Sequence, residues 1–146
     1  MKVVSACLAG VRCRYDGLSK GRGEFERLVA EGEAILVCPE QLGGLPTPRV
    51  PMEIRGGDGG DVLDGKARVV DEEGNDRTAE MIRGAEEALR IARLAGADEA
   101  ILKERSPSCG VRAIVRSGDT AAGSGVAAAL FARAGIPVRS DEEERS

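Results

Sequence analysis

The chain of 146 residues contains no histidine. This absence excludes Ser-His-Asp and Cys-His catalysis, histidine-ligated zinc and haem, and the iron site built from two histidines and a carboxylate. Any chemistry must therefore use cysteine, carboxyl, hydroxyl, lysine, arginine or tyrosine groups, backbone amides or a bound cofactor.

Aromatic residues and positive charge are also scarce. Tyr15, Phe25 and Phe131 are the only aromatic residues, and the formal net charge is −4. Proteins that bind single-stranded nucleic acid stack bases on several aromatic rings, and most nucleic-acid binders present a basic face. The composition therefore argues against a nucleic-acid partner.

The sequence has no apolar run of the roughly 18 residues that a membrane span needs. Its opening residues, 1–7, are too few and too soon interrupted to form a signal peptide. We therefore predict a cytoplasmic protein without membrane contact. In that compartment the four cysteines are expected to bind metal, take part in catalysis or lie buried, rather than to form disulfides.

Short apolar runs alternate with helical patterns along the chain. Strands are predicted at 2–6, 34–37, 66–71, 99–103, 111–116 and 136–138, and helices over 23–31, 76–95 and 125–134. Such alternation predicts one α/β domain, residues 1–146, with a mostly parallel sheet flanked by helices in a Rossmann-like, doubly wound arrangement.

Three further expectations concern the connections. Asp76 or Thr78 is predicted to cap the second helix, and Ser124 to cap the third. Residues 39–60 are rich in proline and glycine and show no periodic pattern, which predicts a long functional loop. The polar residues 141–146 are expected to form a frayed tail.

Three cysteines, Cys7, Cys38 and Cys109, each follow a predicted strand. In an open parallel sheet, ligands bind outside the carboxyl ends of the strands. We therefore predict that these cysteines converge at that edge, where the active site would lie. Cys13 belongs to the same loop as Cys7 and could approach as well.

The spacing of the cysteines leaves several interpretations open. They could be ordinary buried small residues. Structural zinc sites usually contain close C-x2-4-C pairs, and the closest pair here is Cys7-x5-Cys13. An iron–sulfur cluster accepts widely dispersed thiolates and suits a chain without histidine. Three ligands on a four-iron cluster would leave one iron open as a Lewis acid.

Four segments of the chain form distinctive motifs. The first is Ser5-Ala6-Cys7-Leu8-Ala9-Gly10 with Cys13-Arg14-Tyr15-Asp16-Gly17, and the second is Cys38-Pro39-Glu40 with Leu42-Gly43-Gly44-Leu45-Pro46-Thr47-Pro48-Arg49. The third and fourth are Asp61-Val62-Leu63-Asp64-Gly65 and Leu102-Lys103-Glu104-Arg105-Ser106-Pro107-Ser108-Cys109-Gly110. These segments resemble motifs of the DUF523 family, which includes the thiouracil desulfurases. The resemblance runs in order through nearly the whole chain, from about Val4 to Val138.

This resemblance implies a small α/β domain with an oxygen-sensitive [4Fe-4S] cluster, which can be absent or replaced in protein prepared in air. Carried over by motif, the metal ligands would be Cys7, Cys38 and Cys109. Cys13 would be a non-ligand near the cluster, although a four-thiolate cluster that includes it stays open. The implied activity is a non-redox desulfidase acting on a thiolated pyrimidine base or nucleoside, such as 2-thiouracil.

The implied reaction needs a group that transfers protons and a group that holds the substrate. The open iron would bind the substrate sulfur, water would replace that sulfur, and sulfide would leave. Glu40 is the candidate general acid or base, and Ser106 the candidate hydroxyl for positioning or proton relay. Glu40 could instead only pair with Arg14 or Arg49, and Ser106 could only cap a turn before Pro107.

Two alternatives to the desulfidase remain. One is a non-catalytic module that binds zinc or an iron–sulfur cluster, for which all four cysteines would be ligands. The other is an enzyme that uses the thiol of Cys13 or Cys109 as a nucleophile and works without metal. The choice among thiolated substrates and the oligomeric state do not follow from the sequence.

Overall fold

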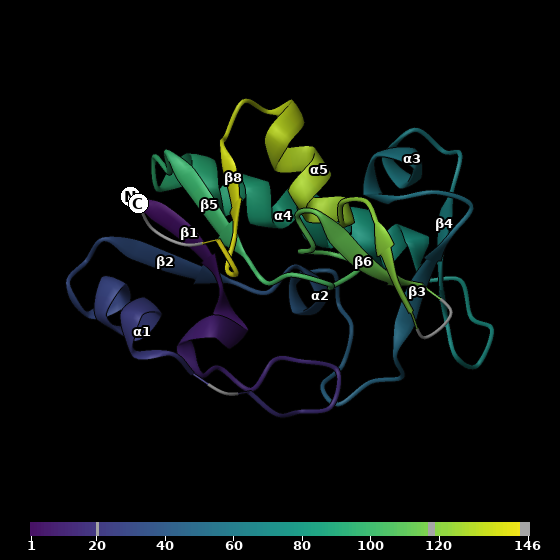
Figure 1. Cartoon of the computed structure of the whole chain (residues 1–146), viewed down its shortest axis with the longest axis horizontal. Coiled ribbons are helices and arrows are strands. Elements are labelled where there is room, and N and C mark those ends of the chain that lie inside the picture. Colours follow the sequence, from purple (N-terminus) through teal and green to yellow (C-terminus); the bar gives the residue numbers. More distant parts are fainter. Residues whose placement is uncertain (20, 117–118, 144–146) are drawn as a thin grey trace.

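A four-stranded parallel sheet forms the centre of the fold in the computed structural model, which describes residues 1–19, 21–116 and 119–143. The strands lie in the order β2-β1-β5-β8, and each neighbouring pair is parallel (Figure 1). Their bounds are Lys2–Ser5 for β1, Ala34–Val37 for β2, Glu99–Leu102 for β5 and Val138–Ser140 for β8. The predicted α/β fold with a parallel sheet is confirmed.

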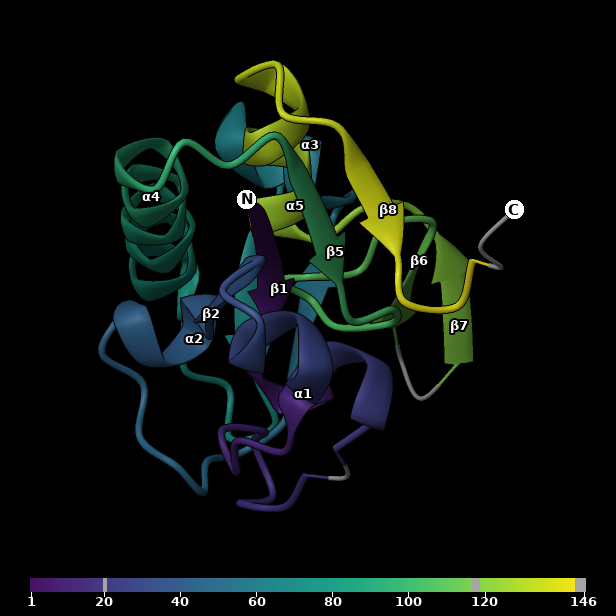
Figure 2. The ribbon, with the colours of Figure 1, turned by 90° about the vertical axis from the view of Figure 1, so that its left-hand side faces the viewer.

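Helices cover both faces of this sheet. Alternate residues of a strand point to opposite faces, so Val4 of β1 packs with Phe25 of one helix while Val3 packs with Phe131 of another. Figure 2 shows α1 on one side of the sheet and α4 and α5 on the other. These helices comprise Gly23–Ala30 (α1), Thr78–Leu94 (α4) and Val126–Arg133 (α5).

Two antiparallel strand pairs lie beside the central sheet, together with α3, on the right of Figure 1. They pack on α4 and α5 through a second apolar cluster that includes Ile54, Met81 and Ile114. The predicted strands 66–71 and 111–116 are therefore present, but they belong to these pairs and not to the parallel sheet. The elements are β3 (Met52–Arg55) with β4 (Arg68–Asp71), β6 (Ala113–Arg116) with β7 (Asp119–Ala122), and α3 (Gly59–Leu63).

The prediction of a long loop over residues 39–60 is wrong. This segment contains α2 (Pro39–Leu42), the strand β3 and the start of α3. Each element has only four or five residues, which is too short to show a helical or strand period. Pro39 fits the first helical position because its fixed φ angle suits a helix and its missing N–H would have no partner there.

The residues expected to cap α4 and α5 do not occupy the capping positions, because Arg77 precedes α4 directly and forms no side-chain capping bond. Asp76 Oδ1 accepts the N–H of Thr78, the first residue of α4, at 2.8 Å. Ser124 does not cap α5, because Gly125 precedes that helix directly. The first amides of α5 instead donate to backbone carbonyl groups of the segment around Ser108, which lies beside the helix start.

The expected frayed tail is wrong for residues 141–143, while residues 144–146 lie outside the described residues. The Asp141 side chain is 4% exposed and binds Arg22 at 3.2 Å. Glu143 forms an ion pair with Arg112 at 2.8 Å. Polar composition predicted fraying, but ion pairs with residues distant in sequence hold this segment. No helix in the described part of the chain has the length and apolar character needed to cross a membrane.

Candidate active site

The carboxyl ends of β1, β2 and β5 face one cavity of about 400 Å³. Cys7 lies in a short 3-10 helix, Ala6–Ala9, that follows β1, and Cys38 follows β2 directly. Cys109 lies in the loop that follows β5, and Cys13 lies in the loop after the 3-10 helix. All four cysteines line the cavity, so the predicted convergence is confirmed for Cys7, Cys38, Cys109 and Cys13.

The four thiols are free and differ in exposure. Cys13 and Cys109 are 2% and 5% exposed, while Cys7 and Cys38 are partly exposed. The thiols of Cys38 and Cys7 are near enough to that of Cys13 to shift its pKa. Cys38 Sγ also lies 3.7 Å from the carbonyl oxygen of Cys13. Cys13 is thus a neighbour of two of the predicted ligands.

Burial and mutual contact keep the thiols of Cys13, Cys38 and Cys109 protonated. The contact with Cys38 lowers the pKa of Cys13, but the contact with Cys7 and burial outweigh it and raise the pKa to about 11. The contact with Cys13, together with burial, raises the pKa of Cys38. Burial raises the pKa of Cys109 to about 12. At neutral pH these groups are therefore neutral, and a bound metal would displace their protons.

Glu40 enters the same cavity from α2 and is held at both carboxylate oxygens. Arg49, whose side chain is 5% exposed, donates from Nε to Glu40 Oε1 at 2.9 Å. Ser108 Oγ donates to Glu40 Oε2 at 3.0 Å, and Ser106 Oγ lies 3.5 Å from the same oxygen. Glu40 therefore pairs with Arg49, as one interpretation expected, and also contacts both serines. Arg14, the other expected partner, forms its ion pair with Asp16 at 3.7 Å.

Ser106 caps a turn and also approaches Glu40. Its Oγ accepts the backbone N–H groups of Ser108 and Cys109, each at 3.1 Å. The expectation that Ser106 caps a local turn is therefore confirmed. The same hydroxyl lies 2.9 Å from Ser108 Oγ, which places it in the polar chain that ends at Glu40.

Sequence reasoning missed Ser108, although it is 2% exposed and contacts both Glu40 and Cys109. In the sequence Ser106-Pro107-Ser108-Cys109, either serine could face the carboxylate. Their assignment depends on how the loop turns, and residue spacing carries no information about that.

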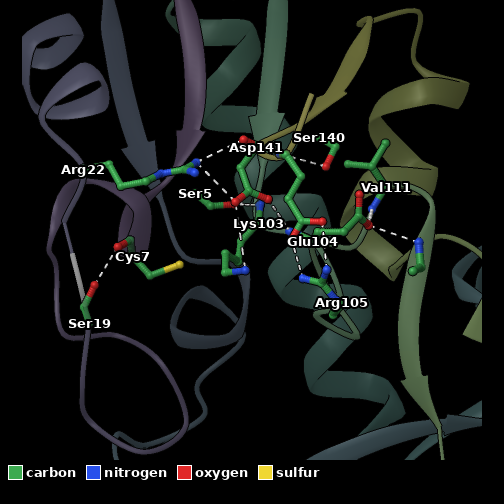
Figure 3. A network of polar contacts seen from close by, with 12 residues as sticks. Ser5, Cys7, Ser19, Arg22, Lys103, Glu104, Arg105, Val111, Ser140 and Asp141 are labelled. Atoms are coloured by element: carbon green, nitrogen blue, oxygen red, sulfur yellow. Dashed lines mark hydrogen bonds and ion pairs between the residues drawn. The ribbon is translucent and has the colours of Figure 1, made fainter. Parts of the chain in front are cut away.

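A polar network behind the cavity fixes the loop that carries these serines. Glu104 Oε1 accepts the backbone N–H groups of Val111, Arg112 and Ala113 at 2.7, 2.9 and 3.0 Å. Figure 3 shows Glu104 beside Asp141, whose Oδ1 accepts the Glu104 N–H at 2.7 Å. Burial alone would raise the pKa of Glu104, but hydrogen bonds from Ser140 and the three amides lower it below its usual value.

The start of α5 holds the same loop from another side. The N–H groups of Val126 and Ala127 donate to the carbonyl oxygens of Pro107 and Ser108 at 2.9 and 2.8 Å. A side chain at Gly125 would lie 2.5 Å from the carbonyl carbon of Ser108, so only glycine permits this approach. The loop is therefore held in place by the start of α5 and by the buried carboxylate of Glu104.

A family model described as 2-thiouracil desulfurase matches residues 3–143. The chain belongs to the 2-thiouracil desulfurase family. The match covers both the central sheet and the added strand pairs, and it includes every cavity residue named above.

Two individual proteins are similar to this chain over nearly its whole length. The chain is 46% identical over 146 residues to an uncharacterized protein, YbbK, of Bacillus subtilis (strain 168), covering 98% of this chain and 97% of YbbK. Its fold matches a solved structure of the [4Fe-4S]-dependent thiouracil desulfidase TudS (DUF523Vcz) with a TM-score of 0.84 and 47% identity. That alignment covers 96% of this chain and 89% of TudS, which confirms the DUF523 resemblance.

Within this family member, the cavity contains further groups besides the thiols, Glu40 and the serines. Tyr15, 43% exposed, and Arg14 line its mouth, while Met52 and Val115 give it an apolar wall. Tyr15 is the accessible aromatic residue, because Phe25 is 2% exposed and Phe131 is fully buried. The cavity can therefore receive a small planar ring between apolar and cationic groups.

Proposed function

We propose that this protein is an iron–sulfur desulfidase that removes sulfur from a thiolated pyrimidine base or nucleoside, such as 2-thiouracil, and releases it as sulfide. The observation that carries the proposal is the meeting of Cys7, Cys38 and Cys109 with Glu40 in one cavity. Family membership and the name of the TudS structure support a desulfidase. A volume of about 400 Å³ suits a small substrate.

The donor set favours a cluster over a single ion. In the described ranges, no three cysteine, histidine, aspartate or glutamate side chains form a group that could hold one metal ion. A cluster assigns each thiolate to a different iron, so its ligands need not meet at one point. Dispersed thiols that share one cavity therefore fit a [4Fe-4S] cluster, the cofactor on which TudS depends.

Cys7, Cys38 and Cys109 would hold the cluster, with Cys13 outside the ligand set. Each of the three follows a different strand, whereas Cys13 lies further along the loop that already supplies Cys7. When bound, such a cluster would supply an iron without a protein ligand, a Lewis acid suited to the soft sulfur of a thiocarbonyl group.

Glu40 would transfer the protons. The overall reaction replaces a carbon–sulfur double bond with a carbon–oxygen double bond: water supplies the oxygen and its two protons leave with the sulfur, so no electron is gained or lost. Glu40 Oε2 faces the hydroxyl groups of the loop, and Arg49 neutralises the carboxylate charge through Oε1. Glu40 can therefore take a proton from water and return it to the departing sulfur.

Ser106 would be the positioning hydroxyl, donating its proton into the polar chain that ends at Glu40. Its position is fixed because its oxygen accepts two backbone N–H groups, which leaves its own proton free to donate. Lys103 and Arg14 line the same cavity and can hold the oxygen or ring nitrogen atoms of the substrate.

Anaerobic reconstitution with iron and sulfide, followed by an assay of sulfide release from 2-thiouracil, tests the proposal. About four irons per chain together with sulfide release are expected. Zinc or free thiols in place of iron would overturn the cluster assignment. Iron bound without sulfide release from thiolated bases or nucleosides would favour the non-catalytic module instead.

Two variants separate the proposed roles. Cys109→Ser is expected to lose or destabilise the cluster, as judged by iron content and the visible absorption spectrum. Glu40→Ala is expected to keep the cluster and lose turnover. Loss of iron from Glu40→Ala would assign Glu40 a structural role, and retained activity would remove it from the mechanism.

A further inference from the structure

Ser108 connects the carboxylate of Glu40 with the sulfur of Cys109. Its Oγ lies 3.0 Å from Glu40 Oε2, 3.6 Å from Cys109 Sγ and 2.9 Å from Ser106 Oγ. The residue is 2% exposed, so water has little access to compete for these contacts. A single buried hydroxyl thus touches the proposed acid–base group and a proposed cluster ligand.

The hydrogen-bonding capacity of the two serines determines the direction of the chain. Ser106 Oγ already accepts two backbone N–H groups, which use both of its lone pairs. In the pair of hydroxyls, Ser106 must therefore donate and Ser108 accept. The one proton of Ser108 then has two possible acceptors, Glu40 Oε2 and Cys109 Sγ. The carboxylate is closer and charged, so it receives the proton.

We propose that Ser108 is a positioning residue for the reaction: it fixes Glu40 Oε2, links Ser106 to Glu40, and gives up its contact with Cys109 to do so. This inference rests on the proposed function. Ser106 lies 3.5 Å from Glu40, at the limit of a hydrogen bond, whereas the route through Ser108 has steps of 2.9 and 3.0 Å.

The surroundings hold Ser108 in this place. Its carbonyl oxygen accepts the N–H of Ala127 at 2.8 Å, and Gly125 packs directly against its backbone. Arg49 holds the other carboxylate oxygen, Oε1. Glu40 is therefore fixed at one oxygen by a charge and at the other by Ser108, and loss of the Ser108 hydroxyl would free that second oxygen.

Kinetics of the reconstituted holoenzyme give the first test. Ser108→Ala is expected to keep its iron, lower kcat about tenfold to a hundredfold, and leave KM within about threefold, because acid–base positioning acts on the transition state. Ser124→Ala is the matched control, since Ser124 lines a separate hollow beside α5 and β8. A Ser108→Ala variant that keeps both its iron and the wild-type kcat would overturn the proposal.

The reduction potential of the cluster gives a test that does not depend on turnover. In Glu40→Gln, Arg49 requires the amide oxygen at the Oε1 position, so the amide nitrogen faces Ser108 and donates to it. The Ser108 proton must then turn to Cys109 Sγ, and a hydrogen bond to a ligand sulfur raises the potential. Loss of the carboxylate charge also raises it, with or without Ser108.

The expected result is therefore a rise in potential on Glu40→Gln that is larger with Ser108 present than in the Ser108→Ala background. Equal rises in the two backgrounds would overturn the proposal. If Ser108→Ala binds no iron, the Glu40→Gln variant alone tests the proposal. The iron–thiolate stretching bands of Glu40→Gln should be more sensitive to exchange into D2O than those of wild type. No added sensitivity would overturn the inference.

The wild-type protein separates this inference from the proposed function. Wild type that binds iron and releases sulfide, with Ser108→Ala unchanged, refutes the role of Ser108 alone. Wild type that binds no iron, or releases no sulfide, refutes the proposed function and with it the inference.

Discussion

Replacing Gly84 with alanine tests whether the contact between α2 and α4 sets the position of the active-site residues. Gly84 lies on α4 against the backbone of α2, the short helix that carries Glu40 and follows Cys38. A Cβ atom at Gly84 would overlap the carbonyl oxygen of Pro39 and lie 2.8 Å from its carbonyl carbon. Neither is the end of a flexible side chain, so the helix itself must move.

The size of the effect follows from this geometry. Non-bonded carbons pack about 3.5–4.0 Å apart, and the carbonyl oxygen overlaps more closely than the carbon, so α2 must shift by at least about 1 Å. A misplacement of about 1 Å at a reacting group can lower the rate about 10²-fold. Overpacking destabilises by about 1–3 kcal/mol, and alanine in place of glycine returns about 1 kcal/mol of helix propensity. We therefore expect a large loss of kcat with a net loss of stability of only about 0–2 kcal/mol.

The assay compares sulfide release with the free energy of unfolding in urea. Gly23→Ala is the matched control, because Gly23 begins α1 and no described atom outside its immediate neighbours lies within 4 Å of the added Cβ. Wild-type kcat and iron content in Gly84→Ala would refute the argument that this contact positions Glu40 and Cys38.

Three other perturbations have definite expected outcomes. Glu104→Gln should destabilise the protein by about 1–3 kcal/mol at pH 7 through loss of a charged acceptor. Because folding lowers the pKa of Glu104 from its ordinary value of 4.5, its contribution is present above that value and is lost as pH falls through the lowered pKa. Urea unfolding should show a smaller difference in the free energy of unfolding between wild type and variant at pH 4 than at pH 7. An unchanged difference would contradict this. Arg49→Met should lower the free energy of unfolding by about 3–5 kcal/mol, because it leaves the Glu40 charge unpaired. Adding Glu40→Gln to this variant should restore most of the lost stability in the same assay. No recovery would refute the pairing argument. Tyr15→Ala should raise KM for 2-thiouracil about 5- to 150-fold by removing about 1–3 kcal/mol of ring stacking, with Tyr15→Phe close to wild type. Equal effects of both variants would assign the loss to the phenol hydroxyl.

Local pattern was enough to predict the central sheet and its helices. The strands β1, β2 and β5 are short apolar runs, and residues such as Val3, Val4 and Ile101 are fully buried because helices cover both faces of the sheet. The prediction for residues 39–60 was wrong because no local pattern marks their elements. These elements are too short to show a helical or strand period, and contacts with α4 and the strand pairs stabilise them. Strand 66–71 was recognised, but its partner β3 was not.

For the site, the sequence by itself determined which reactive groups are available. There are four thiols and no imidazole, and three of the thiols belong to cysteines that follow predicted strands. Parallel strands bring their carboxyl ends to one edge, so the meeting of Cys7, Cys38 and Cys109 followed from the pattern once the fold class was right. Only the tertiary structure decided which hydroxyl contacts Glu40 and what holds Ser108 beside Cys109. Those contacts depend on the turn capped by Ser106 and on the close approach of Gly125. Side-chain direction within a loop is set by such distant packing, and residue spacing does not encode it.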